Sequence, residues 1–219
     1  MDLLETEVRV LGALLEKQRT TPDAYPLSLN ALRAATNQST NRDPVVDYDE
    51  ATIRDALHRL SRRRWARLAS GPGSRAAKYR HLVDEALGLG PPELSVLTVL
   101  MLRGAQTPGE LRARTERLYA FTDAEALHRV LDTLIERELV VRLQRRPGQK
   151  EERYMHLLSE DAEPTEDASP PPSIPDISPP RPAPTPAHTE SAEQRLARLE
   201  REVAELRAEV QALRSELGG

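Results

Sequence analysis

The sequence predicts a mainly α-helical protein with small β-hairpin wings, organised as two tandem winged-helix domains, a disordered Pro-rich linker and a C-terminal coiled coil. Three observations predict this architecture: an order of three helices and a hairpin that occurs twice, a proline-dense stretch, and a terminal heptad pattern. The expected boundaries are 1–86 and 90–158 for the winged-helix domains, 159–189 for the linker and 190–219 for the coiled coil.

The first domain is predicted from helical periodicity and capping residues. An apolar side chain at every third or fourth position from Leu4 to Leu15 predicts an amphipathic helix, which we expect to end near Lys17. Ser28 is a suitable N-cap for a second helix over LNALRAAT, and a third helix is expected to begin at Asp49. Two short strands around a Gly-Pro-Gly turn complete the unit.

The same order follows the helix-breaking segment GLGPP at 88–92. Two S/T-x-x-E patterns, beginning at Thr107 and at Thr122, are typical of capping boxes and predict the starts of the second and third helices of this copy. RYMHL at 153–157 resembles KYRHL at 78–82, so His81 and His156 occupy equivalent positions. A shared structural role explains these histidines better than catalysis.

The chain beyond residue 158 differs in composition. Residues 159–189 contain ten prolines, six acidic residues and one arginine, a composition too polar to form a core. Residues 190–219 show a heptad pattern, and opposite charges at its g and e positions favour a parallel homodimer. The predicted dimerisation residues at positions a and d are Leu196, Leu199, Val203, Leu206, Val210, Leu213 and Leu217.

Charge is distributed unevenly along the chain. Residues 1–158 carry 25 Arg and Lys against 22 Asp and Glu, whereas the remainder carries 6 against 13. Only three of the 31 basic residues are lysines, so most of the positive charge sits on guanidinium groups that can bind phosphate or carboxylate bidentately. This favours nucleic acid or acidic partners.

Three segments of the chain, LLEKQRTTPDAYPLSLNALRAATNQSTNRDPV (14–45), LRGAQTPGELRAR (102–114) and ERYMHL (152–157), closely resemble the YceH-like family of uncharacterised bacterial proteins. The resemblance covers essentially all of residues 1–158. It implies tandem winged-helix domains, often with a C-terminal coiled coil, and implies no activity. The Pro-rich linker is longer here than the resemblance leads one to expect.

In a winged helix the third helix can enter the DNA major groove while the wing touches the backbone. The candidate DNA-binding residues lie before the third helix, on its outer face and in the wings. They are Asn37, Thr40, Asn41, Arg42, Arg54, His58, Arg62, Arg63, Arg75 and Lys78 in the first copy, and Arg129, Arg145, Arg146 and Lys150 in the second. Each set has an alternative explanation, since loop amides can bond their own backbone and charged helix faces or hairpin tips can simply be solvated.

The third helix of the second copy offers only Arg129 and Arg137 among acidic residues, so we expect that copy to be the weaker DNA reader. No metalloprotease, serine-hydrolase or phosphate-loop motif is present, and the chain has no cysteine. We therefore expect no enzyme, no metal and no cofactor. The absence of an export signal and of a long apolar run favours a cytoplasmic protein without a membrane span.

These patterns lead to one expected function and one alternative. We expect a double-stranded DNA-binding protein, a transcriptional regulator dimerised by its C-terminal coiled coil. The alternative is a protein-interaction scaffold whose winged-helix domains bind protein partners without direct DNA contact. The DNA target, any effector ligand and the partner are not encoded in a recognisable motif.

Overall fold

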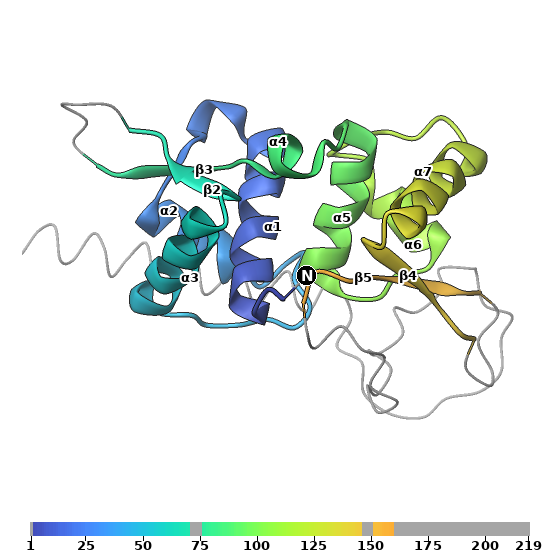
Figure 1. Ribbon diagram of the computed structural model, residues 1–219, viewed down its shortest axis with the longest axis horizontal. Coiled ribbons are helices and arrows are strands. Elements are labelled where there is room, and N and C mark those ends of the chain that lie inside the picture. Colours follow the sequence, from blue (N-terminus) through green and yellow to red (C-terminus); the bar gives the residue numbers. More distant parts are fainter. Residues whose placement is uncertain (1, 71–75, 146–150, 160–219) are drawn as a thin grey trace, which may run out of the picture. The chain divides into compact units, whose positions relative to one another are not determined.

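The computed structural model describes residues 2–70, 76–145 and 151–159. The predicted coiled coil, its seven heptad residues and all of the predicted linker after Ser159 lie outside these ranges. The described part is mainly helical with small antiparallel sheets, as predicted (Figure 1).

One order of elements occurs twice. The first repeat consists of α1 (Glu5–Thr20), the 3-10 helix η1 (Pro22–Ala24), β1 (Leu27–Ser28), α2 (Leu29–Thr36), α3 (Glu50–Arg62), β2 (Ala66–Leu68) and β3 (Lys78–His81). A short helix, α4 (Val83–Leu87), leads to the second repeat, which consists of α5 (Pro91–Arg103), α6 (Pro108–Thr115), α7 (Ala124–Glu136), β4 (Val140–Leu143) and β5 (Arg153–His156). The repeated order was predicted, whereas η1, β1 and α4 were not.

Each repeat ends in an antiparallel hairpin. In the first sheet β3 is central between β1 and β2, with Tyr79 opposite both Leu27 and Leu68. In the second sheet β4 pairs only with β5. An isolated bridge between Gln106 and Tyr154 takes the place that the pairing of β1 with β3 has in the first sheet. The equivalence of the repeats therefore extends to the hydrogen bonding beside each hairpin.

Helix starts follow the predicted capping chemistry with one exception. The Ser28 hydroxyl accepts from the backbone N–H of Ala31 at 3.2 Å, and Thr107 with Glu110 forms a reciprocal capping box. The predicted capping box beginning at Thr122 is wrong, because the N-cap of α7 is Asp123. Its carboxylate accepts from the N–H of Ala126 at 2.7 Å, so a stronger acceptor one residue later starts the helix.

Helix α1 differs from its sequence prediction in length and in burial. It continues to Thr20, three residues past the expected end, and its residues 7–15 are all buried, polar ones included. Leu4, expected on the buried face, is 47% exposed as the N-cap, whereas Leu3 is buried. The reason is that α1 packs against α2 and α3 on one side and against α5 on the other, so it has no solvent-facing stripe at its centre (Figure 1).

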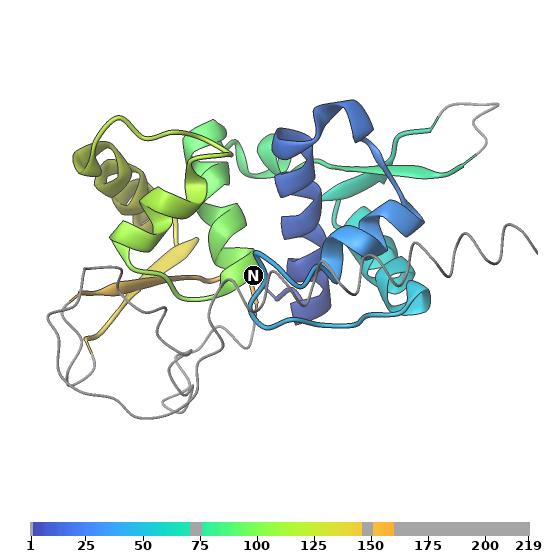
Figure 2. The same cartoon turned by 180° about the vertical axis from the view of Figure 1, so that it is seen from behind.

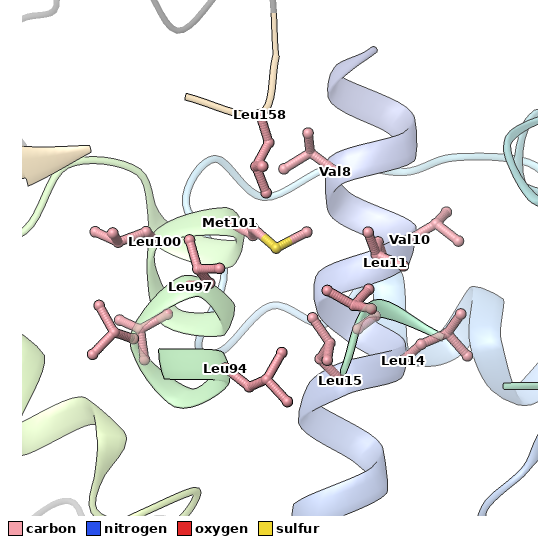
Figure 3. Packing of buried hydrophobic residues seen from close by; sticks show 14 of the residues in the cluster. Val8, Val10, Leu11, Leu14, Leu15, Leu94, Leu97, Leu100, Met101 and Leu158 are labelled. Atoms are coloured by element: carbon pink, nitrogen blue, oxygen red, sulfur yellow. The ribbon is translucent and has the colours of Figure 1, made fainter. Parts of the chain in front are cut away.

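The packing of α1 against α5 joins the two repeats into one compact unit (Figure 3). Apolar side chains from both helices, among them Leu11, Leu15 and Leu97, belong to a single hydrophobic cluster that includes core residues of both repeats. Gly12 lies at the contact, where an added Cβ would come within 2.9 Å of a side-chain carbon of Leu102. A larger residue at position 12 would therefore force the Leu102 side chain, or the helices themselves, to shift.

Candidate nucleic-acid interface

The outer face of α3 is exposed because the helix is strongly amphipathic. Ile53, Leu57 and Leu60 are buried against the rest of the first repeat. Ala56 is buried with them, whereas the charged side chains of the helix lie on its exposed side. All four candidate residues of this helix are exposed, namely Arg54, His58, Arg62 and, at its C-cap, Arg63.

These four side chains differ in their partners. Arg54 forms an ion pair with Glu50 one turn earlier, and Arg63 donates a hydrogen bond of 2.7 Å to the carbonyl oxygen of Asp2. His58 and Arg62 have no hydrogen bond or ion pair with any residue that the structure describes. The end of the helix therefore presents the more available positive charge.

The first hairpin, whose strand β2 packs against α3, carries further exposed cations. Arg67 on β2 lies opposite Arg80 on β3, and the neighbouring pair of Ala66 and His81 is buried. Because side chains alternate along a strand, Arg67, Arg80 and Lys78 share the face of the sheet that points away from the core. Arg80 forms an ion pair of 2.6 Å with Glu85, whereas Lys78 and Arg67 have no side-chain partner among the described residues. The candidate Arg75 lies outside the described residues.

We define the basic face of the first repeat as Arg54, His58, Arg62, Arg63, Arg67 and Lys78. Sequence reasoning did not include Arg67. Alternation along the predicted strand could have indicated that Arg67 is exposed, because its neighbour Ala66 is buried. The register that pairs Arg67 with Arg80 could not be predicted from the sequence.

Most of the candidate loop before α3 has a structural role. Arg42 is buried, and its guanidinium donates to both carboxylate oxygens of Glu16, at 3.0 and 2.6 Å, and to the carbonyl oxygen of Ala35. The interpretation of Arg42 as a DNA contact is therefore corrected: its donors already have protein acceptors. It anchors residues 37–48 instead.

The other polar residues of this loop divide into two kinds. The side-chain amide of Asn37 donates to the carbonyl oxygen of Tyr48 at 2.8 Å and accepts from its N–H at 3.0 Å, closing the loop. Asn41, with φ of 60°, accepts a hydrogen bond from Arg103 of the second repeat. Thr40 is exposed and has no partner among the described residues. Figure 2 shows how this segment passes the end of α5, where the N–H of Asp43 donates to Leu102 at 2.9 Å.

Among its described residues, the second repeat has no comparable basic face. Arg129 is exposed on α7, but Asp132 and Glu136 are exposed on the same helix. Arg137 donates to the carbonyl oxygens of Leu87 and Gly88, so it fixes the chain after α4. Arg145 is exposed in the second hairpin, whereas Arg146 and Lys150 lie outside the described residues.

His81 and His156 are both buried and share one backbone contact, although Nε2 of His81 also lies 2.7 Å from Oε1 of Gln18. In each, Nδ1 accepts a hydrogen bond of 3.3 Å from the backbone N–H two residues later, that of Val83 or Leu158. Burial lowers the pKa of each imidazole from 6.5 to about 4. Both rings are thus neutral at pH 7, and the contacts agree with the predicted structural role.

Within residues 2–70, 76–145 and 151–159, no helix combines the length and the apolar character that crossing a bilayer requires. The same residues contain no group of three or more His, Asp or Glu side chains placed to hold a metal ion.

Comparison with known proteins agrees with the resemblance seen in the sequence. Residues 3–149 match the family described as "Protein of unknown function, DUF480". A UPF0502 protein of Geotalea daltonii is 52% identical over 172 residues, covering 78% of each chain. The UPF0502 protein YceH of Escherichia fergusonii is 42% identical over 205 residues, covering 90% of this chain and 93% of the relative. The chain therefore belongs to the DUF480 family, whose members include the UPF0502 proteins and YceH.

Proposed function

We propose that this protein binds double-stranded DNA through the basic face of the first repeat and acts as a cytoplasmic transcriptional regulator. In this proposal each repeat is a winged helix, with α3 facing the major groove and the β2–β3 hairpin facing the backbone. The observation that supports it most is the set of exposed cations on one helix and the adjoining hairpin, of which Arg62, Arg67 and Lys78 have no acceptor among the described residues.

Phosphate contacts supply the physical reason. A guanidinium that is not already paired can bind a backbone phosphate and release condensed counterions, which makes the affinity depend steeply on salt. The ion pairs of Arg54 and Arg80 with neighbouring carboxylates lower the charge that these two residues can offer. Arg62 and Arg67 are therefore the residues on which the proposal chiefly rests.

The test is a titration of labelled duplex DNA fragments with full-length protein at several salt concentrations. The double variant Arg62→Gln with Arg67→Gln should bind at least about tenfold more weakly, and its salt slope should fall by about two. The matched control is Arg129→Gln with Arg145→Gln, two exposed arginines of the second repeat. This control variant should lose less affinity for duplex DNA than the Arg62→Gln, Arg67→Gln variant.

A scaffold function is the alternative, and exposed apolar side chains favour it. Val45 is 58% exposed and Leu68, on β2 itself, is 54% exposed, which suits a protein contact better than a phosphate contact. Absence of duplex binding at about 50 mM salt, with protein at tens of micromolar, would refute DNA binding and leave this alternative.

Dimerisation through residues 190–219 is a separate part of the proposal, supported by the heptad pattern alone. Full-length protein should sediment as a dimer, and deletion of residues 190–219 should shift it to monomer. Replacing Val203 and Leu206 with charged residues should have the same effect, because charge in an apolar seam must be desolvated. A truncated protein that stays equally dimeric would show that the interface lies elsewhere.

A further inference from the structure

A cavity of about 190 Å³ lies on the contact between the two repeats, bounded by α1, α5, α6 and the loop at Asn41. Its walls are partly apolar, formed by Val99, Leu102 and Leu118 among others. Three arginines also line it: Arg103 in the last turn of α5, Arg114 in the last turn of α6, and Arg117 just beyond α6. A basic residue at the end of a helix is common, but three helix-end arginines sharing one cavity are not explained by helix dipoles alone.

The carboxylates near this cavity do not balance its positive charge. Glu16 is the acidic residue in the lining, and both of its oxygens already accept hydrogen bonds from the buried Arg42. Arg114 lies 3.3 Å from Glu110, whose carboxylate also caps α6. Neither Arg103 nor Arg117 forms an ion pair with a described residue.

The polar atoms of the cavity are unequally available. The hydroxyls of Thr20 and Thr98 donate to carbonyl oxygens of their own helices, at 3.0 and 2.6 Å. Arg103 has a neutral partner, the side-chain oxygen of Asn41. Burial lowers the pKa of Arg103, and the nearby guanidiniums of Arg114 and Arg42 lower it further. The carboxylates of Glu16 and Asp43 act in the opposite direction but are the smaller causes, so net repulsion between like charges remains, which a bound anion would offset.

We propose that this cavity binds a phosphate group, held by the guanidiniums of Arg103, Arg114 and Arg117. The planar donor fork of arginine matches tetrahedral oxyanions and can bind two oxygens at once. The cavity of about 190 Å³ is large enough for one phosphate with a few waters or a small organic group. Because Arg103 of the second repeat also donates to Asn41 of the first, the site lies where the two repeats meet.

The experiment is isothermal titration of full-length protein with inorganic phosphate, in chloride buffer at constant ionic strength. We expect one phosphate per chain. Arg117→Gln should weaken binding by about tenfold or more, because a charge-assisted hydrogen bond is lost, and this exposed residue has no described partner whose loss could unfold the protein. The matched control is Arg112→Gln, an exposed arginine of α6 that does not line the cavity and should bind phosphate as the parent does. No heat above that of added chloride, or an equal loss in both variants, would overturn the proposal.

The phosphate group can belong to a free phosphorylated molecule or to a DNA backbone. Two further measurements, duplex binding by the two variants and competition between phosphate and DNA, distinguish these sources. If duplex binding is unchanged in Arg117→Gln and phosphate does not compete with DNA, the ligand is a free phosphate compound. If duplex binding falls in Arg117→Gln but not in Arg112→Gln, and phosphate competes, the cavity holds a DNA phosphate. Either result supports the phosphate site, and the phosphate titration stands even if the protein binds no DNA.

Discussion

The two repeats share a framework and differ on the surface. In both, a buried histidine near the end of the last strand accepts from the backbone two residues later, and an aspartate caps the third helix. The outer face of α3 is basic, whereas that of α7 mixes acidic and basic residues. The comparison teaches that the repeated positions are those that the core requires, so exposed side chains have to be judged one repeat at a time.

The segment before the third helix shows the second difference. In the first repeat it runs over residues 37–49 and is held by the buried guanidinium of Arg42, while in the second it covers only residues 116–123. The longer segment reaches the end of α5 and contributes Asn41 to the contact between the repeats. Asn37, Asn41 and Arg42 in this segment therefore contribute to the assembly of the fold.

The largest effect is expected from Arg42. Arg42→Ala should lower the free energy of unfolding by about 3 to 5 kcal/mol, since it leaves the carboxylate of Glu16 without its main buried partner. Denaturant unfolding of full-length protein provides the measurement. Arg129→Ala, an exposed position of the second repeat, should change stability by less than about 0.5 kcal/mol. Similar losses for the two variants would mean that Arg42 does not anchor the loop.

The buried histidines should give an intermediate effect that tests whether the repeats are equivalent. Because the folded-state pKa of each is about 4 and the model-compound value is 6.5, the unfolded chain binds more protons between these values. Stability should be full above about pH 6.5 and fall as the pH drops toward 4, by up to about 3 kcal/mol for each histidine.

Chemical denaturation across pH 4 to 7 measures this dependence. His81→Gln and His156→Gln should each remove a similar share of it. A much smaller change for His81 would indicate that its neighbour Asp84, with an oxygen 3.6 Å from Nδ1, stabilises the protonated ring and makes the repeats unequal.

The smallest effect concerns the caps of the third helices. Asp49→Ala and Asp123→Ala should each lower the melting temperature slightly and by a similar amount, because each exposed carboxylate accepts one backbone N–H at 2.7 Å. Thermal unfolding of these variants is compared with that of Thr122→Ala, which removes only the hydrogen bond of 3.0 Å from the Thr122 hydroxyl to the Asp123 carboxylate and should cost less than Asp123→Ala. A larger loss of stability for Thr122→Ala than for Asp123→Ala would indicate that Thr122, and not Asp123, caps the helix.

The repeated order of helices and hairpins was predictable because periodicity and capping are local properties. The bounds of α2 and the start of α3 follow from Ser28 and Asp49 in this way. What could not be predicted depends on packing between distant segments. The burial of Arg42 requires Glu16, far away in the sequence, and the burial of both sides of α1 requires α5. A polar loop and an amphipathic helix have the same local patterns whether or not such partners exist.

The close contact of α1 with α5 at Gly12 has a consequence for cooperativity. Since the core residues of both repeats belong to one hydrophobic cluster, neither repeat can unfold without exposing apolar surface of the other. The described region should melt in a single transition with coincident probes. A cut in the short connection near Gly88 would leave each piece with an uncovered helix face. The duplicated pattern in the sequence therefore does not imply that either repeat can fold on its own.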